Sequence, residues 1–159
     1  MTEQTRRRFV ATAVCAACCS GAAAQSDGRK RIDQITDVGA SAATDMFRFE
    51  PNLIRVSPGD SVVFLNSRGE HTVHSAPALW PENVPLVGIS NRPEAEVVFP
   101  EPGFYGFRCR RHGMYGMVML VVAGNPQIDG TQFAAVDTMK AKEREREAVR
   151  ALLQKYAEL

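Results

Sequence analysis

Short runs of alternating hydrophobic and polar residues, or of β-branched and aromatic residues, occupy the middle of the chain. They predict β-strands at residues 46–49, 53–56, 61–65, 96–99, 104–109 and 118–123. Pro58-Gly59 and Pro102-Gly103 are turn signals between strands. The proline-rich residues 75–94 are typical of a long irregular connection. Several short strands joined by such turns predict a mainly β fold, either a sandwich or a barrel.

After Pro126 the hydrophobic positions change to a helical period. Apolar side chains recur at steps of three and four at Phe133, Val136, Met139, Val149, Leu152, Leu153 and Tyr156. We predict that residues 125–159 form a C-terminal extension of one or two amphipathic helices, packed on the β domain through Val149, Leu152 and Leu153. The alternative is a solvated, frayed tail, because residues 140–147 are almost all charged.

The N-terminal residues have the pattern of an export signal. Arg6, Arg7 and Arg8 precede an apolar stretch over residues 9–20, and small alanines follow it. We therefore interpret residues 1–24 as a signal peptide and expect a bacterial protein exported to the periplasm. The stretch Thr5-Arg6-Arg7-Arg8-Phe9-Val10 resembles the twin-arginine motif, but Ala11 replaces the lysine that often follows it, so the general export route stays open. Residues 25–44 are interpreted as a polar leader, and residues 45–124 as the β domain.

Composition limits the class of protein. The chain has 159 residues, 45% of them hydrophobic and 23% charged, with a net charge of +1. These values fit one soluble globular domain and exclude a collagen-like, disordered or multi-span membrane chain. The near-neutral charge argues against a nucleic-acid binder. Removal of the signal would take three of the four cysteines and leave Cys109 alone. A single thiol in an oxidising compartment points to a bound metal.

Metal-binding side chains are concentrated in two segments. Cys109, His112 and Met117 lie between two predicted strands and offer a thiolate, an imidazole and a thioether. Together with a second imidazole, they are the ligand set of a mononuclear electron-transfer copper site. The second imidazole would come from His71 or His74. Because these two histidines are three residues apart, they would point to opposite faces of a strand and could not both reach one metal.

Five segments of the sequence resemble the cupredoxin family of type 1 blue copper proteins. The resemblance is carried by residues 56–64, 71–73, 102–107, 109–117 and 121–124. It is strongest to the pseudoazurin branch, which also has a helical C-terminal extension. The resemblance implies a two-sheet Greek-key β-sandwich with one copper ion at one end. By the same resemblance, the copper ligands are His71, Cys109, His112 and Met117.

Two residues depart from the family pattern. Thr72 stands where the family usually has an asparagine that braces the cysteine loop, and we expect its hydroxyl to hydrogen-bond that loop less extensively. Arg111 stands in place of the proline that usually precedes the second histidine. With Arg110 it would form a basic rim for an acidic partner, and Met114 would contribute apolar surface beside His112.

The leading hypothesis is a periplasmic, non-catalytic carrier of single electrons. The resemblance implies redox partners such as copper nitrite reductase or a c-type cytochrome. We expect a monomer that neither binds nucleic acid nor inserts stably into a membrane. Two alternatives stay open: a carrier or buffer that hands over Cu(I), suggested by Met114 and Met117, and an enzyme using a Cys–His nucleophile or a catalytic zinc ion. A catalytic zinc ion needs an open coordination position, and Met117 would fill it, which argues against zinc. No oxyanion loop is evident for a hydrolase.

Overall fold

The computed structural model describes residues 28–66 and 71–159, so the predicted signal peptide lies outside the described residues. The first of two sheets has the strand order β2-β1-β4-β7. Its strands are β1 (Lys30–Thr36), β2 (Phe47–Glu50), β4 (Ser61–Leu65) and β7 (Glu94–Val98). The central strand β1 pairs with β2 antiparallel and with β4 parallel.

The second sheet has the order β3-β9-β8-β5-β6. Its strands are β3 (Leu53–Val56), β5 (Thr72–Ser75), β6 (Gly88–Ser90), β8 (Gly103–Arg108) and β9 (Val118–Ala123). Strand β3 pairs with β9 parallel, and the other pairs of this sheet are antiparallel. Two mixed sheets with two C-terminal helices confirm the predicted fold class.

Strand β9 is buried on both faces. Its alternate residues Met119 and Val121 belong to the core between the sheets, while Leu120 and Val122 belong to a second core under the helices. Since successive side chains of a strand point to opposite faces, this division is the period-2 pattern expected of a strand between two hydrophobic layers. The inter-sheet core also contains Ile32, Phe49, Phe64, Val97, Phe99, Tyr105 and Phe107.

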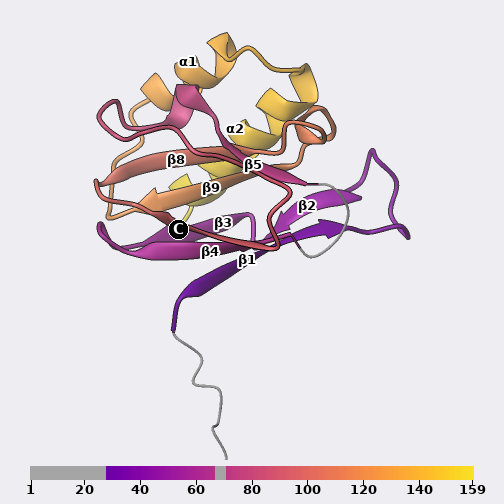
Figure 1. Cartoon of the computed structure of the whole chain (residues 1–159). Helices are drawn as coiled ribbons and strands as arrows, with labels where there is room; N and C mark the ends of the chain where they lie inside the picture. The colour runs from indigo at the N-terminus through magenta and orange to yellow at the C-terminus, as the bar shows by residue number, and fades with distance from the viewer. Residues whose placement is uncertain (1–27, 67–70) are drawn as a thin grey trace, which may run out of the picture.

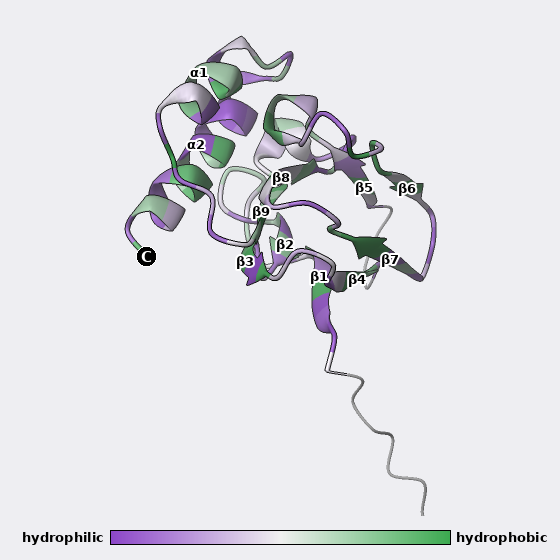
Figure 2. Ribbon diagram, turned by 90° about the vertical axis from the view of Figure 1, so that its left-hand side faces the viewer, coloured by the Kyte–Doolittle hydropathy of each residue, from purple (hydrophilic) through white to green (hydrophobic). Residues whose placement is uncertain are grey.

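Two helices cover the outer face of β8 and β9 (Figure 1). They are α1 (Thr131–Thr138) and α2 (Glu143–Ala157), and two single-turn 3-10 helices, η1 (Pro77–Leu79) and η2 (Gly113–Tyr115), lie in the connections. Figure 2 shows hydrophilic and hydrophobic residues alternating along α2. Val149, Leu152 and Leu153 are buried there. The prediction that the extension packs through these three residues is thus confirmed, and the alternative of a frayed tail is wrong.

The structure corrects two predictions about irregular segments. Residues 25–44 were expected to be a polar leader, but they contain β1, whose Ile32 and Gln34 are buried on either side of Asp33. Residues 75–94 contain the short edge strand β6. Both strands are stabilised by pairing with distant parts of the chain, which a local hydrophobic pattern does not reveal.

Within the described ranges, the longest helix is α2, and no helix combines the length and the apolar character needed to cross a bilayer.

A substitution in α2 tests the packing of the extension. We expect Leu153→Ala to lower the free energy of unfolding by about 2–5 kcal/mol, because it leaves a cavity at a fully buried position. The measurement is denaturant unfolding of the metal-free protein. Gln154→Ala, at the neighbouring exposed position, is the control. Equal losses in both variants would contradict a packed helix.

Candidate metal centre

The loop formed by residues 109–117 connects β8 to β9 and is tied to itself by backbone hydrogen bonds. The amide of Cys109 donates to the carbonyl of Met117 (3.1 Å), and the amide of Met117 donates to the carbonyl of His112 (3.2 Å). The amide of Gly113 donates to the carbonyl of Cys109 (2.7 Å). Gly116 adopts a left-handed conformation with φ 94°, which glycine reaches without steric cost. These bonds hold the loop as a closed turn on the β8–β9 pair.

His71 joins this loop from the neighbouring strand. It immediately precedes β5, which pairs with β8 so that His74 lies opposite Arg108. The Nδ1 atom of His71 lies 3.1 Å from Nδ1 of His112. The Sγ atom of Cys109 lies 3.6 Å from Nδ1 of His112.

The three donor atoms are arranged to share one ion. One ligand atom from each of His71, Cys109 and His112 lies within 4.8 Å of the others. Metal–ligand bonds of imidazole nitrogen and thiolate sulfur are about 2.0–2.3 Å long in a comparable site, so donors at these separations fit around a single cation. Two imidazoles and one thiolate form a soft donor set suited to copper.

His74 lies away from these donors. Its side chain is half-buried and lines a groove together with Arg108 and Arg110. Of the two candidate histidines, the structure therefore brings His71, and not His74, to Cys109 and His112.

Burial keeps both clustered imidazoles neutral. The pKa of His71 falls to about 4 because burial penalises the charged ring, and His112 adds a smaller repulsion. Burial also lowers the pKa of His112, with a further contribution from Arg111. A neutral imidazole has a free nitrogen lone pair, which is the form that binds a metal.

The far nitrogen of His71 is held by a residue that the sequence analysis missed. Nε2 of His71 lies 2.9 Å from the hydroxyl of Thr36, the last residue of β1. When Nε2–H donates to this hydroxyl, the lone pair remains on Nδ1, the atom that faces Cys109 and His112. Thr36 lies in the segment interpreted as a leader, so its role depends on a strand pairing that no local motif signals.

Thr72 braces the loop as its hydroxyl was expected to do. Its Oγ1 accepts a hydrogen bond from the amide of Arg110 (2.9 Å) and donates to Sγ of Cys109 (3.7 Å). Thr72 is buried, so both contacts are shielded from water. A single hydroxyl thus fixes the backbone just after the cysteine and polarises its sulfur.

An aromatic stack supports His112. The ring of Phe47, on β2, lies parallel to the imidazole of His112 at 3.9 Å between centroids and 4° between planes. Phe47 also approaches Tyr115, with centroids 5.6 Å apart. The stack orients His112 and covers one face of its ring. Sequence reasoning did not find this contact, because β2 and the loop are far apart in the chain.

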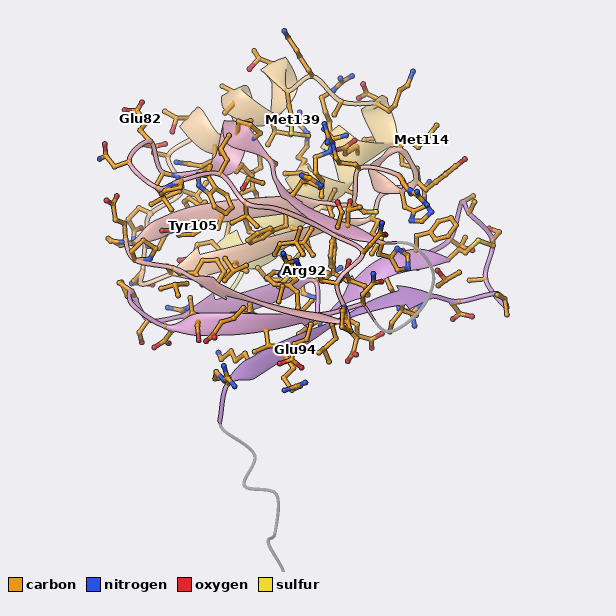
Figure 3. All side chains as sticks on the ribbon, in the orientation of Figure 1. Glu82, Arg92, Glu94, Tyr105, Met114 and Met139 are labelled. Atoms are coloured by element: carbon orange, nitrogen blue, oxygen red, sulfur yellow. The ribbon has the colours of Figure 1, made fainter. Side chains whose placement is uncertain are left out.

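The other predicted residues occupy two environments. Met117 has no exposed surface and belongs to the same core as Cys109. Met114 is 46% exposed, and Arg110 and Arg111 are also exposed. Figure 3 shows Met114 and Tyr105 toward opposite ends of the sandwich. The donor cluster therefore lies at one end of the sandwich, with a buried inner side and an exposed outer rim.

Comparison with known families decides which family the chain belongs to. The model of the copper-binding proteins of the plastocyanin/azurin family matches residues 36–124. The chain belongs to this family. The matched range includes both segments that carry the donor cluster, so this copper-binding family and the His71–Cys109–His112 geometry agree on one copper ion.

Individual members of the family are similar over part of the chain. A pseudoazurin of Methylorubrum extorquens is 41% identical over 80 residues, which are 50% of this chain and 54% of that protein. A pseudoazurin of Paracoccus pantotrophus is 33% identical over 98 residues, which are 62% of this chain and 67% of that protein. The chain therefore aligns with about half to two thirds of the length of these relatives.

Solved structures of this family share the fold. The crystal structure of pseudoazurin from Methylobacterium extorquens has a TM-score of 0.66 and 27% identity, and the alignment covers 80% of this chain and 98% of that one. A pseudoazurin from Sinorhizobium has a TM-score of 0.67 and 25% identity, and the alignment covers 80% of this chain and 95% of that one. The likeness extends over most of the described chain.

The contact between Thr36 and His71 can be tested by an isosteric substitution. We expect Thr36→Val to weaken copper binding by about 10- to 100-fold, because His71 loses the partner that orients its ring. The affinity is measured by competition with a chelator of known affinity. Thr138→Val, at an exposed helix position, is the matched control. An unchanged affinity in Thr36→Val would contradict the orienting role.

Proposed function

We propose that this protein is a mononuclear blue-copper electron carrier that shuttles single electrons between redox proteins in the periplasm and catalyses no reaction of its own. The observation that carries the proposal is the convergence of Sγ of Cys109 and one ring nitrogen each of His71 and His112 within 4.8 Å of one another. Thiolate and two imidazoles, with a weak axial thioether, are the ligand set of copper sites that transfer electrons.

The proposed ligands are His71, Cys109, His112 and Met117. Met117 is offered as the axial ligand because it is fully buried beside Cys109 and its amide is bonded to the carbonyl of His112. Copper bound here would supply a one-electron couple between Cu(I) and Cu(II). The protein contributes a fixed donor set: Thr36 orients His71, Thr72 braces Cys109 and Phe47 stacks on His112. Such fixed ligands keep the rearrangement between oxidation states small.

Burial of the donors favours electron transfer over transfer of the metal itself. Cys109 and His71 have 0% and 1% of their surface exposed. A Cu(I) carrier needs donors that an acceptor protein can reach, whereas electrons need only a short path to the surface. The half-buried His112 provides that path at the outer end of the site.

The proposed location follows from the N-terminal pattern. Residues 1–24 are proposed to be a signal peptide that directs the protein to the periplasm, and they lie outside the described residues. We also propose that the cupredoxin domain and the C-terminal helical extension act together as one unit, because α2 is part of the hydrophobic packing of β9. The proposed oligomeric state is a monomer.

The rim of the site suggests the charge of the partner. Arg110 and Arg111 are exposed on the 109–117 loop, and the side chains of Met114 and Tyr115 add exposed apolar surface there. A partner with acidic groups around an apolar contact fits this rim. A c-type cytochrome or a copper nitrite reductase is proposed as the class of partner, and nucleic acid is not.

The colour of the copper-loaded protein tests the proposed function. We expect an intense thiolate-to-copper absorption in the visible and a reversible one-electron couple, because the thiolate is bound directly to the metal. Cys109→Ser removes the sulfur and should abolish the absorption.

His74→Ala is the matched control for this experiment. His74 is the other histidine of the same segment and lies outside the donor cluster, so its loss should leave the colour unchanged. A copper-loaded wild-type protein without colour would refute the proposed function.

The basic rim can be tested through the rate of encounter. We expect the double variant Arg110→Gln/Arg111→Gln to slow association with an acidic redox partner, with the difference shrinking as ionic strength rises. Rates are measured by stopped-flow spectroscopy across a salt series. Lys155→Gln, near the opposite end of α2, removes one charge away from the rim and should have little effect. Equal effects of these changes would exclude specific steering by the rim.

A further inference from the structure

Glu145 is a buried acid within residues 140–147, a segment of almost entirely charged residues that the sequence predicts to be exposed to solvent. It lies in the first turn of α2, and only 1% of its surface is exposed. A carboxylate is rarely buried without a partner, because desolvation of the charge is costly. The surroundings of Glu145 must therefore supply a partner for its carboxylate.

The first contact of Glu145 is an ion pair with the residue that precedes Cys109. Oε1 of Glu145 lies 2.8 Å from Nε of Arg108, and Oε2 lies 3.0 Å from Nη2. The contact between Nη2 and Oε2 is a hydrogen bond, and the contact between Nε and Oε1 is an ion-pair contact without hydrogen-bond geometry. A charge-assisted hydrogen bond is stronger than one between neutral groups. Arg108 ends β8, so the pair ties the first turn of α2 to the strand that leads into the 109–117 loop.

The second contact of Glu145 is with the loop itself. A Cβ atom placed on Gly113 would lie 3.0 Å from Oε2 and 3.2 Å from Oε1 of Glu145. The carboxylate thus rests directly against the backbone of Gly113, and a side chain at this position would displace it. Gly113 follows His112, and its amide is bonded to the carbonyl of Cys109.

Arg144 adds a third tie between α2 and the same loop. Its Nε donates to the carbonyl of Tyr115 (3.0 Å), and its Nη2 donates to the carbonyl of Ala43. Neighbouring residues of one helical turn therefore reach the backbone at Gly113 and Tyr115, the first and last residues of η2.

We propose that the first turn of α2 is a positioning device for the metal site: Glu145, paired with Arg108 and supported by Arg144, holds the 109–117 loop in place and balances the charge beside Cys109. The loop-holding part stands on the contacts above, and the charge-balancing part rests on the proposed function. These residues touch the backbone around the donors and act through it.

The charge-balancing role determines whether loss of the Glu145 charge raises or lowers the reduction potential of bound copper. The Glu145 carboxylate offsets the positive charge of Arg108, which directly precedes Cys109 in the chain. Glu145→Gln keeps the shape of the side chain but leaves the Arg108 cation unbalanced inside a poorly solvated region. An added positive charge disfavours Cu(II) relative to Cu(I), so the reduction potential should rise.

The first arm of the test measures the reduction potential of copper-loaded variants by voltammetry. We expect Glu145→Gln to raise the ratio of Cu(I) to Cu(II) at equilibrium by up to about tenfold, which is about 59 mV for a one-electron couple. Glu145→Gln/Arg108→Gln removes both charges and should return the potential toward that of the wild type. Glu147→Gln, at an exposed position of the same helix, is the control and should leave it unchanged.

A merely structural role predicts a different pattern. Loss of packing alone would make the double variant at least as perturbed as Glu145→Gln. That outcome, or an unchanged potential in Glu145→Gln, overturns the charge-balancing role. If Glu145→Gln does not fold, Glu145→Asp withdraws the carboxylate by one methylene and should still raise the reduction potential, by a smaller amount. An unchanged potential in Glu145→Asp would then overturn the charge-balancing role.

The second arm needs no metal and so is independent of the proposed function. We expect the amides of Gly113 and Gly116 to exchange with solvent about tenfold faster or more in metal-free Glu145→Gln and Arg144→Gln than in the wild type, because the loop opens more readily once a tie is lost. Unchanged exchange in both variants would overturn the positioning role. A colourless wild-type protein would refute the proposed function while leaving this result standing.

Discussion

The antiparallel pairing of β8 with β9 is the constraint on which the rest of the site depends. Its register runs from Gly103 opposite Ala123 to Arg108 opposite Val118. Because the last pair stands directly at the loop, Cys109 and Met117 are brought together as the next two residues and are bonded through their backbones. The thiolate and the neighbouring imidazole therefore acquire their positions from a sheet, and only a short turn remains for the loop to define.

The site is completed where the two sheets meet. His71 and the 109–117 loop belong to the sheet that contains β8, whereas Thr36 and Phe47 come from β1 and β2 of the other sheet. Each imidazole thus has one side toward the donor cluster and the other against a side chain of the opposite sheet. Packing of the two sheets therefore also places the side chains that orient both imidazoles.

The C-terminal helices serve two purposes at once. Their apolar residues form the second core with Leu120 and Val122, which allows β9 to be hydrophobic on both faces. The polar first turn of α2 then reaches the loop through Glu145 and Arg144. A helix anchored by its buried face is rigid enough to present these charged groups at defined positions, because their long side chains start from a fixed backbone.

The sequence by itself determined a short segment of candidate donors, most strands and the packed face of α2, because these depend on local spacing and periodicity. Local spacing left the second imidazole between His71 and His74, and the fold brings His71 to the cluster. The short interval from Cys109 to Met117 keeps three candidate donor side chains near one another in any compact turn, and the apolar period of Val149, Leu152 and Leu153 marks the buried face. Only the tertiary structure decided that β1 belongs to the sandwich, that Thr36 and Phe47 support the imidazoles, and that Glu145 is buried. Each of these depends on contacts between residues more than 30 positions apart, such as Arg108 with Glu145, and the residue types involved carry no local signal of their partners.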